Sequence, residues 1–370
     1  MQYHFRGMSL RDIRRQVGQL AVVGFDGHTV TDDVRRMAKA FDLGGVVFFK
    51  RNVAEPEQVM EMSRESRALA RELPVWISVD QEGGRVARLK RPFTEWPPMI
   101  TLGRSQDESL ARRFAKALAD ELAAVGINLD YTPVLDIFTN PKNSVIGDRA
   151  LAERAEDVAR LGTVIIRTLQ GAGMAACGKH FPGHGDTTSD SHFELPLIEH
   201  GPDRLDAIEL VPFKAAIAAD VAAIMTAHIL IPAFDEERPA TLSPAIVDGL
   251  LKQKLGFTGV VFTDDMSMKA IAGRYGLSEA TILAIAAGCD GVLMCAAEPE
   301  AQMAALEALI YAVEQGRLPV RRVEDAMARQ RRAKERFLSM PEKRLHADSL
   351  RTVLGRDEHQ AIAAEMARFA

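Results

Sequence analysis

Short apolar runs alternate with amphipathic stretches along almost the whole chain, and this alternation limits the possible folds more than any other feature. Each run has the length of a strand and is followed by a stretch with helical periodicity. Strands that are apolar throughout are typical of a parallel sheet buried on both faces. The predicted strands are Leu20–Phe25, Gly45–Phe49, Val75–Val79, Ile127–Val134, Met174–Cys177, Ala222–Thr226, Gly259–Thr263 and Gly291–Met294.

About eight strand–helix units predict an α/β fold, a single (β/α)8 barrel of the TIM type. A doubly wound sheet is the competing fold, but it fits less well because polar residues follow most of the strands. No linker rich in proline, glycine or serine divides the chain. We expect residues 1–340 to form the barrel and residues 341–370 to form a helical carboxyl-terminal extension packed on it.

The composition is that of an ordinary soluble protein and suggests a small-molecule partner. The 370 residues carry a net charge of -5, and lysine and arginine do not cluster, so no nucleic acid or membrane partner is expected. The three cysteines, Cys177, Cys289 and Cys295, lie in or beside apolar segments and are predicted to be buried and reduced. The amino-terminal stretch lacks the apolar centre of a signal peptide, so we expect a cytoplasmic protein.

The stretch from Gly178 to His192, GKHFPGHGDTTSDSH, holds three histidines within fifteen residues and follows a predicted strand. Its polar side chains and its glycines and proline predict a surface loop, because a buried strand would leave them without partners. Lys179 and His180 then stand at the carboxyl end of the strand that ends at Cys177. Active sites of α/β barrels lie at these strand ends.

Charged and polar residues follow several other predicted strands as well. One such residue alone is often a helix cap or a solvated surface group. Their convergence on one end of a barrel favours a functional site, because few structural reasons would gather so many there. The residues expected around this mouth are Asp80, Arg88, Asp136, Arg149, Lys179, His180, His228 and Asp264.

Four motifs in these segments resemble those of family 3 glycoside hydrolases, and within that family the bacterial β-N-acetylglucosaminidases of cell-wall recycling. They occur in the expected order, and the resemblance covers about residues 15 to 340, nearly the whole chain. The motifs are Val79–Arg85 (VDQEGGR), Lys179–Gly185 (KHFPGHG), Asp190–His192 (DSH) and Phe262–Met268 (FTDDMSM).

The resemblance implies a retaining exo-hydrolase that removes a terminal, non-reducing β-linked N-acetylglucosamine. It implies that Asp264 is the nucleophile, which forms a covalent glycosyl-enzyme, and that His192 is the acid/base with Asp190 as its partner. An imidazole suits this role because its unperturbed pKa of about 6.5 lets it give and take a proton near neutral pH. The implied substrates are N-acetylglucosaminyl-anhydromuramyl fragments of peptidoglycan.

The resemblance also implies which residues bind the sugar: Asp80, Arg88, Arg149, Lys179 and His180. Carboxylates and multiple N–H donors suit ring hydroxyls. No cofactor and no metal are expected, and we expect a monomer.

The residues themselves leave some questions open. Asp265 follows Asp264, and since adjacent residues of an extended chain point to opposite sides, only one of the two should face the mouth. A substrate-assisted mechanism, in which the acetamido group attacks, also fits an Asp–Asp pair. Glu82 and Arg85 are expected to serve the turn in which they lie.

The strongest alternative of another class is a metal-dependent hydrolase on the same barrel, with ligands among His180, His184, Asp186, Asp190 and His192. Its weakness is that these residues crowd into one loop, whereas barrels gather metal ligands from several strand ends. A phosphorolytic glycosidase is a second alternative, because a histidine acid/base is compatible with phosphate as the acceptor. A non-catalytic sugar-binding module is a third.

Overall fold

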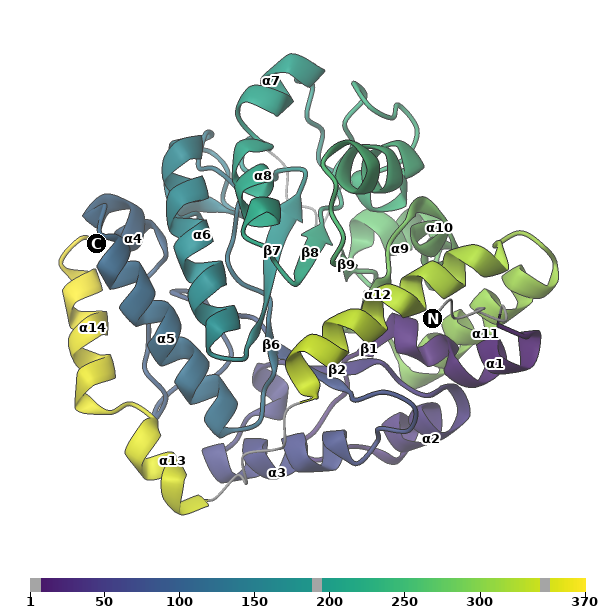
Figure 1. The fold of residues 1–370 in the computed structure, drawn as a ribbon, viewed down its shortest axis with the longest axis horizontal. Helices are drawn as coiled ribbons and strands as arrows, with labels where there is room; N and C mark the ends of the chain where they lie inside the picture. Colours follow the sequence, from purple (N-terminus) through teal and green to yellow (C-terminus); the bar gives the residue numbers. More distant parts are fainter. Residues whose placement is uncertain (1–7, 188–194, 340–346) are drawn as a thin grey trace, which may run out of the picture.

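Eight parallel strands close into a barrel, as the apolar runs predicted, and helices surround it (Figure 1). The computed structural model describes residues 8–187, 195–339 and 347–370. Around the barrel the strands follow the order β1, β10, β9, β8, β7, β6, β3 and β2. Their bounds are β1 Ala21–Val23, β2 Gly45–Phe48, β3 Trp76–Val79, β6 Leu129–Asp130, β7 Ala175–Phe181, β8 Ala223–Thr226, β9 Val260–Asp265 and β10 Gly291–Met294. A short antiparallel hairpin of β4 Gln81–Gly83 and β5 Val86–Ala87 follows β3.

Helices connect successive strands of the barrel, as the alternation in the sequence predicted. Thr31 caps α2, since its side chain accepts a hydrogen bond from the Val34 backbone N–H at 3.4 Å. The bounds are α1 Leu10–Gln16, α2 Asp32–Phe41, α3 Pro56–Arg67, α4 Ile100–Ser105, α5 Glu108–Ala124, α6 Ala155–Gly171, α7 Pro202–Ala207, α8 Val211–Ala218, α9 Lys269–Tyr275, α10 Leu277–Ala287, α11 Pro299–Glu314, α12 Val320–Leu338, α13 Ala347–Val353 and α14 Asp357–Ala367. Short 3₁₀ turns are η1 Val17–Leu20, η2 Lys50–Asn52, η3 Gly147–Arg149 and η4 Ala240–Leu242, and a π-helix, η5 Ala245–Lys254, precedes β9.

The strands are buried on both faces, which explains their apolar sequences. One set of side chains fills the inside of the barrel, including Val47, Trp76, Tyr131 and Phe262. The alternate side chains pack outward against the helices and form the larger hydrophobic core. The barrel is therefore a filled core with its functional groups at one end.

Helix α12 covers the amino-terminal end of the barrel, and Figure 1 shows it lying across the strands. The Lys334 ammonium donates to Gln19 Oε1 at 2.7 Å and to the Gly44 carbonyl at 2.8 Å. Trp76 Nε1, from inside the barrel, donates to Gln330 Oε1 at 2.9 Å. This end is sealed by buried polar contacts, so the opposite end holds the pocket.

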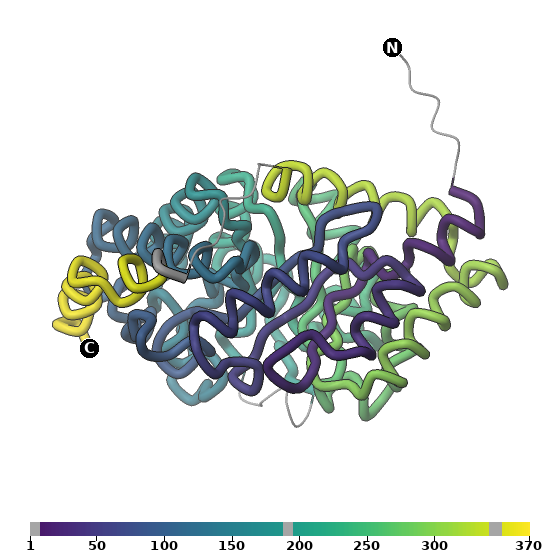
Figure 2. The backbone as a smooth tube through the Cα atoms, turned by 90° about the horizontal axis from the view of Figure 1, so that it is seen from below, coloured from purple at the N-terminus to yellow at the C-terminus, as the bar shows by residue number. Residues whose placement is uncertain are grey.

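Helices α13 and α14 lie beside α5, far from α11 (Figures 1 and 2). The Glu121 carboxylate of α5 accepts from His359 Nδ1 at 2.8 Å, from the Gly355 backbone N–H at 2.9 Å and from Thr94 Oγ1 at 2.7 Å. These buried contacts tie the carboxyl-terminal helices to the barrel. The predicted boundary at residue 340 falls outside the described residues and stays a prediction.

The predicted surface loop from Gly178 to His192 is wrong for its first part. Gly178–Phe181 complete β7, and residues 182–185 and 187 are buried as well. Burial is possible because the polar side chains of this stretch find partners, Lys179 in Asp80 and His180 in Asp136. Sequence polarity alone does not reveal such partners.

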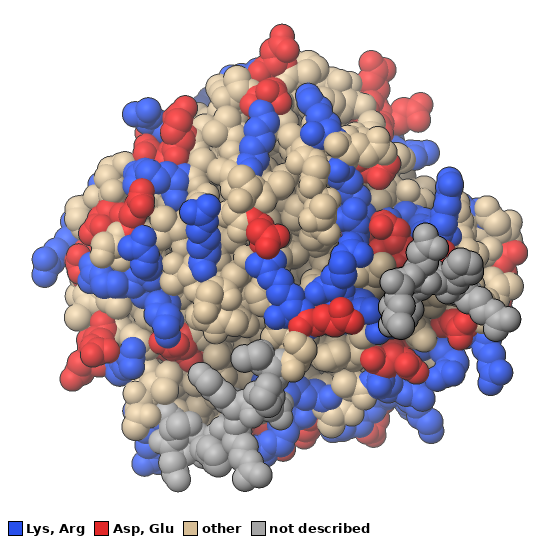
Figure 3. Space-filling model, in the orientation of Figure 1, with Lys and Arg blue, Asp and Glu red and all other residues tan. Residues whose placement is uncertain are grey.

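The three cysteines are buried and free, as predicted. On the face shown in Figure 3, acidic and basic side chains are interspersed. Among the residues that the structure describes, no helix has the length and the apolar character needed to cross a membrane.

Candidate active site

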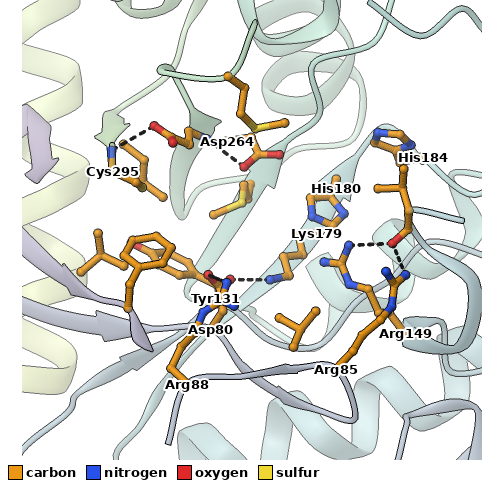
Figure 4. Close-up of a pocket in the computed structure, with 18 of the residues that line it drawn as sticks. Asp80, Arg85, Arg88, Tyr131, Arg149, Lys179, His180, His184, Asp264 and Cys295 are labelled. Carbon is orange, nitrogen blue, oxygen red and sulfur yellow. Dashed lines mark hydrogen bonds and ion pairs between the residues drawn. The ribbon is translucent and has the colours of Figure 1, made fainter. Parts of the chain in front are cut away.

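A pocket of about 340 Å³ lies at the carboxyl-terminal end of the barrel (Figure 4). β3, β7 and β9 each deliver polar side chains to it as they end. Six residues predicted from the sequence line it together: Asp80, Arg88, Arg149, Lys179, His180 and Asp264.

A chain of alternating charges runs along one side of the pocket. Arg88 Nη2 lies 3.1 Å from Asp80 Oδ2, and Asp80 Oδ1 lies 2.7 Å from Lys179 Nζ. Lys179 Nζ in turn lies 2.6 Å from Glu82 Oε1. Glu82 then binds Arg149 in a bidentate pair, with Nε and Nη2 both at 2.8 Å.

The charges in this chain stabilise one another. Burial alone would raise the pKa of Asp80, but Lys179 and Arg88 outweigh it and hold that pKa well below its usual range. Glu82 is likewise opposed by burial, yet Arg149 and Lys179 lower its pKa to about 2. Burial would lower the pKa of Lys179, but Asp80 and Glu82 raise it above its usual value. All three side chains are therefore ionised at neutral pH.

Glu82 and Arg85 do more than serve a turn. The Glu82 side chain is fully buried in β4, at the centre of the charge chain. Arg85 Nη2 donates to the carbonyls of Ser144 and Val145 at 2.7 and 2.6 Å, which joins the hairpin to the loop before η3. The sequence marks Glu82 only by its place in the VDQEGGR motif.

Asp264 lies in β9, across the pocket from the Asp80–Lys179 pair in Figure 4. Its Oδ1 accepts the Asp265 backbone N–H at 2.8 Å. Burial raises the pKa of Asp264, but the neighbouring His180 and His228 lower it further, so the net shift is downward. The carboxylate is thus held in its charged form at the mouth of the barrel.

Asp265 also lines the pocket, and the expectation that only one of the two aspartates faces the mouth stays a prediction. Its Oδ1 is nevertheless occupied, since it accepts the backbone N–H groups of Ser267 and Cys295 at 3.0 and 2.9 Å. The Asp264 carboxylate therefore accepts fewer backbone hydrogen bonds than that of Asp265.

Asp136 and His228 do not line the pocket but lie behind its wall, both fully buried. Asp136 Oδ2 contacts His180 Nδ1 at 2.6 Å, and Asp136 Oδ1 accepts the His184 backbone N–H at 2.6 Å. His228 Nε2 donates to the Asp265 carbonyl at 3.0 Å. Asp136 thus holds His180 and His184 in place, and His228 holds the backbone at Asp265.

Lys179 and His180 are adjacent, yet both reach the pocket. The pairing of β7 with β8 shifts register between Lys179 and Phe181. Such an irregularity turns a side chain that strict alternation would send to the other face. Regular strand periodicity does not predict this arrangement.

Part of the pocket wall is apolar. Val47, Phe49, Tyr131, Met225 and Leu293 line it. A pocket that offers both polar groups and apolar surface is suited to a sugar ring, which carries hydroxyls at its edge and C–H groups on its faces.

Asp190 and His192 belong to residues 188–194, outside the described part of the chain. The roles expected for them stay predictions. The chain reaches this segment through His184, which lines the pocket, and through Thr187, whose Oγ1 lies 2.8 Å from His184 Nδ1.

The structure separates those residues of the metal alternative that it describes. His180 and His184 gather around Asp136, whereas Asp186 lies beside His200 and Glu209. Within the described residues this second group alone has the spacing of a metal site, and Arg204 Nη2 already lies 3.3 Å from both of its carboxylates. An arginine placed there neutralises the charges that would attract a cation.

Comparison with known proteins places this pocket in a family. Residues 12–333 match the N-terminal domain of glycosyl hydrolase family 3. A β-hexosaminidase of Thiobacillus denitrificans is 40% identical over 275 residues, which are 73% of this chain and 76% of the relative.

Two solved structures are similar along nearly the whole chain. A family 3 β-N-acetylglucosaminidase from a Paenibacillus strain superimposes with a TM-score of 0.92 and 43% identity, over 96% of this chain and 68% of the other. NagZ from Neisseria gonorrhoeae in complex with N-trifluoroacetyl-D-glucosamine gives a TM-score of 0.76 and 32% identity, over 97% of this chain and 99% of the other. The chain therefore belongs to glycosyl hydrolase family 3.

Proposed function

We propose that this protein is a retaining exo-β-N-acetylglucosaminidase. The observation that carries the proposal is a pocket in which the ionised Asp264 stands opposite a chain of sugar-binding charges. Its volume of about 340 Å³ is at the small end of the roughly 300–1,000 Å³ of ligand pockets, which suits one sugar ring. The β-hexosaminidase and β-N-acetylglucosaminidase relatives support the same activity.

In this mechanism Asp264 attacks the anomeric carbon and forms a covalent glycosyl-enzyme. A nucleophilic carboxylate must be ionised, and the lowered pKa of Asp264 supports this role. Its attachment to β9 and the hydrogen bond from the Asp265 N–H limit its motion. Direct attack is favoured over the substrate-assisted route because Asp265 has its Oδ1 bound to backbone N–H groups.

The charge chain binds the sugar. Asp80 accepts hydrogen bonds from ring hydroxyls, while Lys179, Arg88 and Arg149 donate. Because these four side chains are fixed to one another through Glu82 and Asp80, they need little reordering when the sugar arrives. His180, held by Asp136, completes the set of donors.

His192 acts as the acid/base, with Asp190 as its partner. The support is the DSH motif and its place shortly after the pocket residue His184 and after Thr187, whose Oγ1 contacts His184. The imidazole protonates the leaving oxygen and later takes a proton from water.

We further propose peptidoglycan fragments of the N-acetylglucosaminyl-anhydromuramyl type as substrates and the cytoplasm as the compartment. The motif resemblance supports both, and three buried free cysteines are in keeping with a reducing compartment. Phosphate in place of water as the acceptor remains the alternative reaction.

Turnover of an aryl β-N-acetylglucosaminide, compared with the β-glucoside and with and without phosphate, tests the activity. The expected result is hydrolysis of the first substrate at a rate that phosphate leaves unchanged. Asp264→Ala should abolish turnover while sugar binding, measured by calorimetry, persists. A slow fluorinated substrate should leave an adduct on Asp264 in mass spectrometry; an adduct on another residue would refute the assignment.

A further inference from the structure

Asn143 lies in the long segment between β6 and α6, and both polar atoms of its side chain are engaged although it is only 3% exposed. Its Oδ1 accepts the backbone N–H groups of Val145 and Ile146 at 3.0 and 2.9 Å. Its Nδ2 donates to the carbonyls of His184 and Gly185 at 2.7 and 3.0 Å. One amide group therefore joins two segments that border the pocket.

The acceptor half of this amide supports Arg149. The Arg149 backbone N–H donates to the Ile146 carbonyl at 2.9 Å, and its Nη1 donates to the Val145 carbonyl at 3.1 Å. Val145 and Ile146 are the two residues whose N–H groups Asn143 binds. The orientation of the Arg149 guanidinium thus depends on a peptide stretch that Asn143 fixes.

The donor half supports the backbone that leads to Asp190 and His192. Asn143 Nδ2 also contacts Thr187 Oγ1 at 3.3 Å, directly before residue 188. Gly185 is pressed against the neighbouring segment so closely that an added Cβ would lie 1.8 Å from the Ile137 carbonyl. The chain thus enters residues 188–194 from a fixed position.

The chain leaves that segment by a different kind of anchor. The Ile198 backbone N–H donates to the Leu230 carbonyl at 3.0 Å, and the Leu230 N–H donates to the Pro196 carbonyl at 2.8 Å. Backbone pairing holds this side without a dedicated side chain. On the preceding side, asparagine side chains bind residues 184–187. Asn140 Nδ2 donates to the Thr187 carbonyl at 3.2 Å, and Asn143 makes more such contacts than Asn140.

We propose that Asn143 is a positioning residue that couples the sugar-binding Arg149 to the segment carrying the acid/base. The inference rests on the proposed function, since it takes His192 as the proton donor. Its physical basis is that a displacement of about 1 Å at a reacting group can cost about 100-fold in rate. An amide that bridges both segments limits the displacement of the proton donor relative to the bound sugar.

Asn143→Asp tests the donor half of this amide separately from the acceptor half. Aspartate retains the acceptor for Val145 and Ile146, but it has no N–H for His184 and Gly185 and sets a negative charge against their carbonyls. Asn143→Ser is the neutral second variant, because a serine hydroxyl can still cap nearby backbone N–H groups. It keeps the test available if the aspartate variant does not fold.

Asn128→Asp is the matched control. Asn128 Oδ1 accepts the Ile77 N–H at 2.9 Å and Nδ2 donates to the Val75 carbonyl at 3.3 Å, so the same chemistry is removed. These contacts lie at the amino-terminal ends of β3 and β6, away from the pocket. A general effect of the substitution on stability would appear in this variant as well.

The readout is kcat/KM, which reports the glycosylation step, on a β-N-acetylglucosaminyl disaccharide and on an activated aryl glycoside. An acid matters most for the poor leaving group, where its loss costs about 10²- to 10⁴-fold. We expect Asn143→Asp and Asn143→Ser to lose at least about tenfold on the disaccharide but less than about threefold on the aryl glycoside. Asn128→Asp should change neither value.

His192→Ala in the same assay separates the two proposals. If it shows the leaving-group effect and folded Asn143 variants do not, the role of Asn143 is refuted while the proposed function stands. Equal losses of the Asn143 variants on both substrates would also refute it. If His192→Ala behaves as wild type on both substrates, the acid is not His192, and the acid/base assignment and the role of Asn143 both fail while the glycosidase activity stands.

Discussion

Glu82→Gln removes one negative charge from the centre of the charge chain and keeps the size of the side chain. Arg149 and Lys179 lower the pKa of Glu82 from 4.5 to about 2. Since one pKa unit corresponds to about 1.4 kcal/mol, this carboxylate adds about 3 kcal/mol to the free energy of unfolding at neutral pH. Loss of one partner from a buried ion pair costs about 3–5 kcal/mol, a similar magnitude. The side chain is fully buried, so solvent does not screen it.

Urea unfolding at several pH values measures this contribution. Because the pKa is lower in the folded state, the stabilisation is complete above the unfolded pKa and is lost as the pH falls towards the folded one. The difference between wild type and Glu82→Gln should therefore shrink by about 2 kcal/mol between pH 7 and pH 3. The control is Glu95→Gln, whose carboxylate is 45% exposed in an ion pair with Arg91. It should change stability by less than about 0.5 kcal/mol.

The same variant should lose activity because Arg149 and Lys179 share the Glu82 carboxylate. With an amide in its place the two cations are no longer fixed, and kcat/KM for the aryl glycoside should fall about 100-fold. A variant as stable as wild type at pH 7, or a stability difference that is constant down to pH 3, would refute the electrostatic reasoning. Normal kcat/KM would refute the role in sugar binding.

Three further predictions concern stability and metals. Burial lowers the pKa of Lys334 to about 7. Above that pH the unfolded chain binds more protons at this group than the folded chain does. The free energy of unfolding of the wild type should therefore rise by about 2 kcal/mol from pH 7 to pH 9 through Lys334. Urea unfolding of Lys334→Met should lack this rise, and an unchanged slope would contradict the assignment. Glu121→Gln weakens the buried contacts to Gly355 and His359 and should cost about 3 kcal/mol, with faster proteolysis ahead of α14 than in wild type. Glycosidase activity should survive exhaustive dialysis against chelator, and its loss with recovery on adding zinc would support the metal alternative.

The barrel could be predicted because buried parallel strands leave a local signature. β2 lies within the predicted range Gly45–Phe49, and β10 has the predicted bounds Gly291–Met294. The largest disagreement is β6, which spans only Leu129–Asp130 of the predicted Ile127–Val134. Pro133 has no backbone N–H to offer a neighbouring strand, so the regular strand ends early, although the Thr132 and Pro133 carbonyls still accept backbone N–H groups of β7.

The site was predictable in its strand-end residues and not in the residues that hold them. Asp80, Lys179 and Asp264 stand where strands end, which a sequence pattern reveals. Glu82 owes its role to its ion pair with Arg149, 67 residues later, and that contact exists only once the barrel has formed. Asn143 shows the same limit, because its partner His184 lies 41 residues away.

The pairing of β1 with β10 has a consequence for how the protein is made. Ala21 lies beside Val292, so one edge of β1 has no partner until β10, the last strand of the barrel, has been synthesised. At about 5–20 residues per second, translation keeps that edge unpaired for roughly 15 to 50 seconds. An open strand edge is a template for association with other chains, so the nascent protein is most prone to aggregation during this interval. Translation that stops before Gly291 leaves two unpaired sheet edges instead of a smaller enzyme.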